Sequence, residues 1–128
     1  MLITVSDVRL ALGDAYATYP DDPTIQSFIT KREDELKELI GLDDLTAASY
    51  QNLLKQYLVN VVAMDVLRYD LLGKDSADSL DYTIGDLREN KSQNVKLKQQ
   101  WIETFKESAE IALNTYFMKT IGYKQVNL

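Results

Sequence analysis

Apolar side chains recur every three or four positions along most of this chain, a spacing that predicts α-helices. The first helix is expected over residues 7–12, with Ser6 as its N-cap and Gly13 as its end. Residues 14–22 are then expected to form a loop, because they lack that spacing.

The second helix is expected to begin after Asp22, which suits the N-cap, with Pro23 at the first helical position. It should run to about residue 40, where Gly41 stops it. The charged stretch 31–38 then lies mostly on its solvent side. Its apolar positions share one face and are Ile25, Phe28, Ile29, Leu36, Leu39 and Ile40.

Two longer helices are expected over residues 47–72 and 94–120, the first of them capped by Thr46. A polar loop over residues 74–94 separates them and carries a short strand-like segment, Tyr82-Thr83-Ile84-Gly85, in its middle. Residues 121–128 form a tail. The predicted fold is one all-α domain over residues 1–128: an antiparallel helical bundle of two long and two shorter helices, with the long loop between the long helices.

The composition excludes several kinds of chemistry. The chain has neither Cys nor His, so it lacks disulfides, thiolates, the commonest general base and the commonest transition-metal ligand. Its net charge of -6, with no basic run longer than Lys31-Arg32, disfavours binding of a nucleic-acid backbone. Gly-rich phosphate loops and hydrolase motifs are also missing from the sequence. We therefore expect no enzymatic activity, no cofactor and no bound metal.

The sequence also bears on location. Its apolar runs all fall short of the roughly 18 residues that would span a bilayer. The first residues lack the charged and apolar regions of a signal peptide. An intracellular, soluble protein without a membrane partner is expected.

Two charged residues, Asp65 and Arg68, fall on the apolar stripe of the third helix. They are three positions apart, so their side chains can meet, and an unpaired buried charge would be strongly destabilising. We expect an ion pair at the edge of the core; a contact across a subunit interface and a catalytic carboxylate are the alternatives. The apolar members of the stripe are Leu54, Tyr57, Leu58, Val61, Met64, Leu71 and Leu72.

The fourth helix carries two neighbouring stripes. The milder one consists of small and apolar residues, which would admit another helix at close range or form a partly exposed flank. The main apolar face is formed by Trp101, Ile102, Phe105, Ala109, Ala112, Leu113 and Tyr116. The milder stripe, a candidate subunit interface, is formed by Thr104, Ser108, Ile111, Thr115 and Met118.

The predicted loop carries two further patterns. Its carboxylates are spaced unlike an EF-hand, so a solvated acidic loop is favoured over a Ca²⁺ or Mg²⁺ site. The segment Tyr82-Thr83-Ile84 is rich in β-formers and is expected to pair with another chain by strand addition, with Leu87 adding an apolar contact. Folding back onto its own helices is the alternative. The carboxylates are Asp75, Asp78, Asp81 and Asp86.

The order of these parts resembles the head–tail connector (adaptor) proteins of long-tailed phages and related proviruses. The short opening helix carries Val5-Ser6-Asp7-Val8-Arg9, and Asp-Asp-Pro-Thr-Ile at residues 21–25 leads a helix that ends in Leu39-Ile40-Gly41. A long apolar helix follows, then a loop with Tyr82-Thr83-Ile84-Gly85-Asp86, then a long helix with Tyr116 near its end. In that family the loop often carries a similar Ile/Val-Gly-Asp element. The loop here continues as Leu87-Arg88-Glu89-Asn90, which is more charged than the family pattern.

The resemblance implies a structural virion protein in the neck of the particle, assembled in the host cytoplasm. It implies a homo-oligomeric ring of about twelve copies beneath the portal protein, extending the DNA channel toward a further connector or tail-completion protein. DNA would pass through an acidic lumen without specific binding. A small cellular helical adaptor or regulatory protein, acting through protein–protein contacts, is the alternative.

Two groups of residues follow as candidate sites. Those for the subunit interface are Asp65, Arg68, Tyr82, Ile84, Leu87, Thr104, Ser108, Ile111, Thr115 and Met118. Those for docking to the portal or another partner are Tyr123, Lys124, Gln125, Val126, Asn127 and Leu128.

Overall fold

The computed structural model describes residues 2–72 and 85–120, with side chains in the second range from residue 95 onward. The regular structure within these ranges is all helical, which confirms the all-α class. Its α-helices are α1 (Val5–Leu12), α2 (Asp22–Ile40), α3 (Gln51–Asp70) and α5 (Gly85–Thr120). Two short 3₁₀ helices, η1 (Asp14–Tyr16) and η2 (Leu45–Ala47), lie between them.

Helix α1 starts two residues earlier than predicted, because Thr4 rather than Ser6 is its N-cap. The Thr4 hydroxyl accepts a hydrogen bond from the Asp7 backbone N–H at 3.3 Å, and the Asp7 carboxylate accepts one from the Thr4 N–H at 2.9 Å. This reciprocal capping box satisfies two backbone donors at once, which the Ser6 cap would not. Gly13 ends the helix as expected, at φ +94°.

Helix α2 is capped by Asp21, one residue before the predicted Asp22. The Asp21 carboxylate accepts a hydrogen bond from the Thr24 N–H at 3.1 Å. Hydrogen bonds from the Thr24 side chain and from this backbone N–H lower the pKa of Asp21. The predicted end at Gly41 is confirmed: its φ is +74°, a left-handed conformation that suits glycine, and its N–H donates to the Lys37 carbonyl at 2.9 Å.

Helix α3 begins at Gln51, so the predicted start at residue 47 with a Thr46 cap is wrong. The Asp44 carboxylate accepts hydrogen bonds from both the N–H and the hydroxyl of Thr46, at 3.0 and 2.7 Å. Thr46 is therefore held in the separate 3₁₀ helix η2. Tyr50, at φ +54°, then turns the chain into α3.

Helix α5 begins at Gly85, about nine residues before the predicted start, so the expected loop over residues 85–94 is wrong. Leu87 accordingly lies in this helix and not in a loop. Residues 85–100 contain the good helix formers Leu, Arg, Glu, Lys and Gln. The strand-like residues 82–84 and the tail, residues 121–128, lie outside the described residues.

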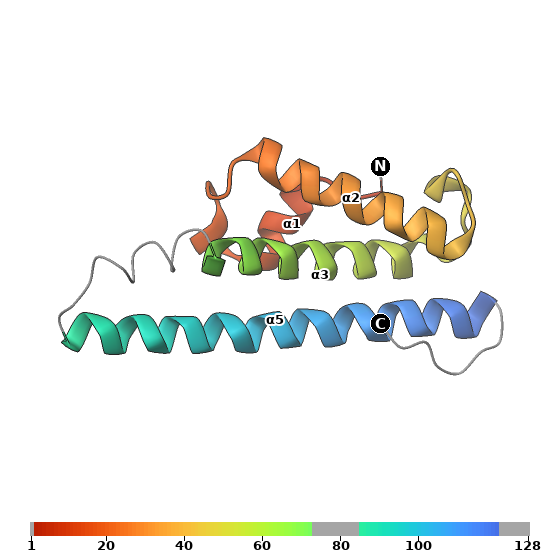
Figure 1. Ribbon diagram of the computed structural model, residues 1–128. Coiled ribbons are helices and arrows are strands. Elements are labelled where there is room, and N and C mark those ends of the chain that lie inside the picture. The colour runs from red at the N-terminus through yellow and green to blue at the C-terminus, as the bar shows by residue number, and fades with distance from the viewer. Residues whose placement is uncertain (1, 73–84, 121–128) are drawn as a thin grey trace.

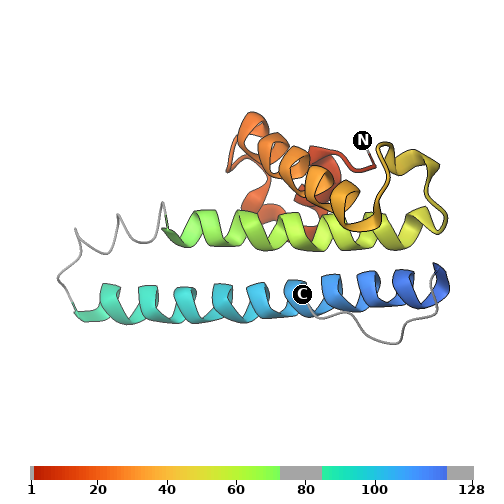
Figure 2. The same cartoon turned by 45° about the vertical axis from the view of Figure 1, so that its right-hand side comes forward.

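Helices α3 and α5 run antiparallel side by side, and α2 covers the side of α3 that faces away from α5 (Figures 1 and 2). Helix α1 packs against both α2 and α3. Because α3 is central, its buried residues lie all around its circumference. They include Val62, Ala63, Val66 and Leu67 in addition to Leu54, Tyr57, Leu58, Val61 and Met64 of the predicted stripe. Leu71 is only partly buried and Leu72 is 76% exposed, so the prediction that the stripe reaches residue 72 is wrong. The first turns of α5 extend past the end of α3 in both views.

Candidate protein-interaction site

The structure contradicts the predicted pairing of Asp65 with Arg68. The Arg32 guanidinium on α2 donates two hydrogen bonds to the Asp65 carboxylate, each 2.7 Å long, and a third to Glu35 at 3.1 Å. The hydrogen bonds that Arg32 donates to the Asp65 carboxylate raise the pKa of Arg32. This fork-to-carboxylate geometry is the strongest form of an ion pair, and it commits Asp65 to contacts within the subunit.

Arg68 instead is exposed, and its side chain makes no hydrogen bond or ion pair with the residues that the structure describes. It stands at the edge of a cleft of about 320 Å³ over α3, between α2 and α5. We call this cleft the α3 groove. Its lining residues are Arg32, Tyr57, Val61, Met64, Arg68, Lys106, Ala109 and Glu110.

The α3 groove has an apolar floor and a charged rim. Tyr57, Val61, Met64 and Ala109 form the floor and are at most 6% exposed. Burial raises the pKa of the Tyr57 phenol, with the nearby Arg32 charge opposing that shift. An apolar floor beneath cationic side chains suits an apolar group that carries carboxylates close by.

The milder stripe predicted on the fourth helix lies on the outside of α5. Ile111 is 67% exposed and Met118 48% exposed, far above core values. The hydroxyls of Thr104 and Thr115 donate to carbonyls of their own helix, those of Gln100 and Ile111, at 3.0 and 2.7 Å. These bonds satisfy the hydroxyls locally, so both threonines can offer their methyl groups to a partner.

The predicted main face of α5 is largely confirmed, with one correction. Ile102, Ala109, Ala112, Leu113 and Tyr116 are buried, as is Phe117, and Phe105 is partly buried. Trp101, however, is 45% exposed and lines a second cleft with Ala11 and Leu12 of α1. Together with the half-exposed Leu97 it extends the outer stripe at spacings of three and four residues. We call Leu97, Trp101, Thr104, Ser108, Ile111, Thr115 and Met118 the outer strip.

Two further carboxylates, those of Asp70 and Glu33, are buried. The Asp70 side chain accepts hydrogen bonds from the Tyr16 hydroxyl at 2.6 Å and the Lys98 ammonium at 2.8 Å, so it joins η1, α3 and α5. Its other oxygen has no hydrogen-bond partner among the described residues. Glu33 accepts a hydrogen bond from the Leu2 backbone N–H at 3.0 Å. No sequence signal marks either residue, because their partners are 28 or more positions away.

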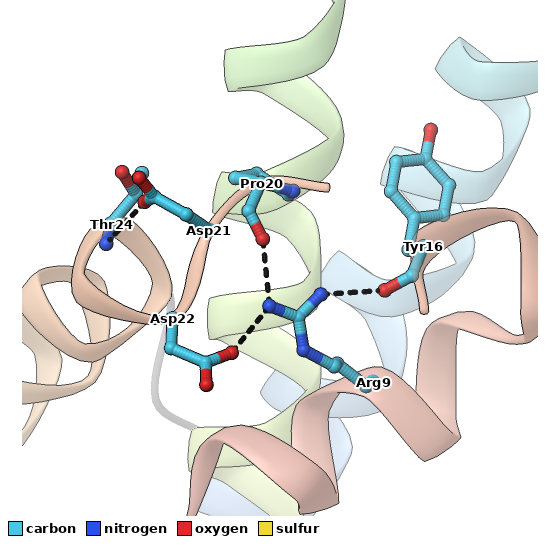
Figure 3. Close-up of polar contacts among 6 residues, drawn as sticks. All are labelled: Arg9, Tyr16, Pro20, Asp21, Asp22 and Thr24. Atoms are coloured by element: carbon cyan, nitrogen blue, oxygen red, sulfur yellow. Dashed lines mark hydrogen bonds and ion pairs between the residues drawn. The ribbon is translucent and has the colours of Figure 1, made fainter. Parts of the chain in front are cut away.

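Arg9 organises the connection between α1 and α2 (Figure 3). Its guanidinium donates to the backbone carbonyls of Tyr16 and Pro20, at 2.8 and 2.7 Å, and to the Asp22 carboxylate at 2.6 Å. The Tyr19–Pro20 peptide bond within this connection is cis. The guanidinium thus holds two backbone carbonyls and one carboxylate of the connection in place, which is a structural task.

The structure bears on several of the remaining predictions. The described residues contain no cluster of three or more His, Cys, Asp or Glu that could hold a metal ion. Within those same ranges no helix has the length and apolar character needed to cross a membrane. Asp75, Asp78 and Asp81 of the predicted loop, and the tail residues 123–128, lie outside the described residues; Asp86 falls in the first turn of α5.

Comparison of the chain with protein-family models, with curated proteins and with solved structures finds no match. The two surfaces that bear on function are the α3 groove and the outer strip.

Proposed function

We propose that this chain is a structural virion protein: a head–tail connector that forms a ring between the portal protein and the next connector or tail-completion protein. The observation that carries the proposal is the outer strip of α5. Apolar residues and small hydroxyl-bearing residues there recur together at the spacing of a helix-packing seam. Ile111 in that strip is 67% exposed and Met118 is 48% exposed. An exposed seam of this kind is typical of a surface that another helix covers.

A closed ring needs two different surfaces on each copy, since every contact in it joins one face to another. The outer strip supplies one of them, and the α3 groove with Arg68 supplies the other. The antiparallel pair of long helices serves as the rigid body of each subunit. In the proposal, about twelve copies close the ring, and the segment 82–84 adds as a strand to a neighbouring copy.

The remaining parts of the proposal concern the partners. The tail, residues 123–128, docks on the portal protein. The net charge of -6 repels the phosphate backbone, so DNA slides through the channel without specific binding. The ring belongs to the neck of the virion and assembles in the host cytoplasm. The chain acts without catalysis and without a cofactor.

The test compares two single variants in a mixture with the portal protein of the same genome. Ile111→Asp places a charge in the outer strip, whereas Leu39→Asp alters an equally apolar and 49% exposed residue on α2. The proposal expects Ile111→Asp to abolish the large complex seen by light scattering, with circular dichroism of the free chain unchanged. Leu39→Asp should assemble like the wild type. Normal assembly of Ile111→Asp would refute the role of the outer strip.

If the wild-type chain does not bind the portal and instead binds one or two cellular proteins through the outer strip, the chain is better described as a small helical adaptor. That function uses the same exposed apolar residues and differs in stoichiometry.

A further inference from the structure

The α3 groove carries two cationic side chains, Arg68 and Lys106, beside a single unpaired carboxylate, Glu110, so that its free side chains carry a net positive charge among the described residues. Arg32 is neutralised by Asp65 and Glu35. Arg68 and Lys106 make no ion pair with any residue in the described ranges, although the chain as a whole is strongly acidic. Two free cations above an apolar floor predict a ligand in which carboxylates flank an apolar side chain.

The outside of α5 carries a ridge with that chemistry. Glu103, Glu107 and Ile111 follow one another every four residues, so they lie along one line of the helix surface. All three are exposed, and neither carboxylate forms an ion pair with another described residue. The ridge from 103 to 111 is about 12 Å long and the groove from Tyr57 to Arg68 about 16 Å, so the lengths fit.

We propose that the α3 groove of one copy receives the Glu103–Glu107–Ile111 ridge of a second copy of this chain. The two carboxylates face Arg68 and Lys106, while Ile111 packs onto the floor at Val61 and Met64. This inference rests on the proposed self-assembly and names the contact that each pair of neighbours makes. Ile111 contributes most of the affinity, because rim ion pairs mainly set orientation and association rate.

The groove and the ridge of a single chain do not pair with each other in the structure. Lys106 and Glu107 are consecutive residues on one helix, so their side chains point about 100° apart, and Glu103, three positions before Lys106, forms no ion pair with it. A second copy is therefore needed, and in the proposed ring its contact is head-to-tail. Such a contact leaves a free groove at one end and a free ridge at the other, and repeats until the assembly closes.

Charge reversal tests the pairing directly. The groove variant is Arg68→Glu with Lys106→Glu, and the ridge variant is Glu103→Lys with Glu107→Lys. Each variant alone brings like charges together and should lose self-association at least tenfold. In an equimolar mixture the reversed groove of one variant meets the reversed ridge of the other, and the two unchanged surfaces also meet. Opposite charges then face each other at every contact, so the mixture should assemble as an alternating complex. The matched control reverses the exposed Lys55 and Glu38, which lie outside both surfaces, and should change nothing.

Cysteine cross-linking tests the same contact without the portal, and the chain has no Cys of its own to interfere. At millimolar concentration under mild oxidation, a mixture of Arg68→Cys and Glu107→Cys chains should form disulfide-linked dimers at least tenfold faster than Lys55→Cys with Glu107→Cys. Equal rates, or failure of the mixed charge variants to assemble, would overturn the inference. Fast cross-linking of a chain that forms no complex with the portal would support this contact between copies and refute the connector function.

Discussion

The buried link between Asp70 and Lys98 makes the most demanding prediction about stability. Asp70 has only 4% of its side chain exposed, and Lys98 has 21%. Lys98→Met keeps an apolar stem of similar length but removes the ammonium, so one buried carboxylate loses its counter-charge. The Tyr16 hydroxyl still donates to it at 2.6 Å.

Removing one partner of a buried ion pair typically destabilises a protein by about 3–5 kcal/mol. Lys98 is partly exposed and Tyr16 remains, so we expect a loss of about 2–3 kcal/mol. For a domain of this size that corresponds to a fall in Tm of roughly 6–15 °C.

Urea and thermal unfolding at pH 7, followed by far-ultraviolet circular dichroism, measure this loss. Lys96→Met is the matched control, because Lys96 is an exposed lysine on the same helix, and it should change the free energy of unfolding by less than about 0.5 kcal/mol. Adding Asp70→Asn to Lys98→Met should recover part of the loss, since the amide carries no charge. Equal stability of Lys98→Met and Lys96→Met would refute the reasoning.

Three further predictions concern other contacts. Arg32→Met leaves Asp65 without its counter-charge and should lower the free energy of unfolding, measured in urea, by about 2 kcal/mol. Arg32→Lys should have an intermediate effect, because lysine cannot form the bidentate pair. Unchanged stability of Arg32→Met would contradict that pair. Thr4→Ala removes the cap of α1 and should lose about 1 kcal/mol, unlike Ser6→Ala, and equal losses would contradict the assignment. Because burial raises the pKa of Tyr57 above its ordinary value of 10.0, the folded chain retains this proton longer than the unfolded chain, so stability should fall as pH rises beyond 10.0. Tyr57→Phe should remove that part of the slope, and an unchanged slope would show that Tyr57 is not responsible.

Local sequence signals predicted the end of a helix correctly where a single residue determines it. Gly13 and Gly41 end their helices because both adopt positive φ angles, which glycine accepts without strain. Caps were harder to assign, because neighbouring polar residues compete. Thr4 prevails over Ser6 since Asp7 completes a capping box with it.

The hydrogen-bond partners of the buried carboxylates could not be predicted, because these partners are far away in the sequence. Asp65 has Arg68 one helical turn away, yet its carboxylate meets Arg32, 33 positions earlier, because α2 crosses that side of α3. Asp70 likewise finds Tyr16 and Lys98 on two other elements. In the candidate site, periodicity on one helix predicted the part of the outer strip from Thr104 to Met118, whereas Trp101 was wrongly assigned to the buried face. The α3 groove could not be predicted, because it depends on how α2, α3 and α5 pack together.

The central claim, that this chain is a connector that assembles on a portal, is tested most directly by light scattering of the wild-type protein alone and mixed with the portal protein of the same genome. We predict a large complex of defined mass in the mixture, with a whole-number ratio of connector to portal chains that fits a closed ring. A chain that keeps the same small mass with and without the portal would contradict the connector function.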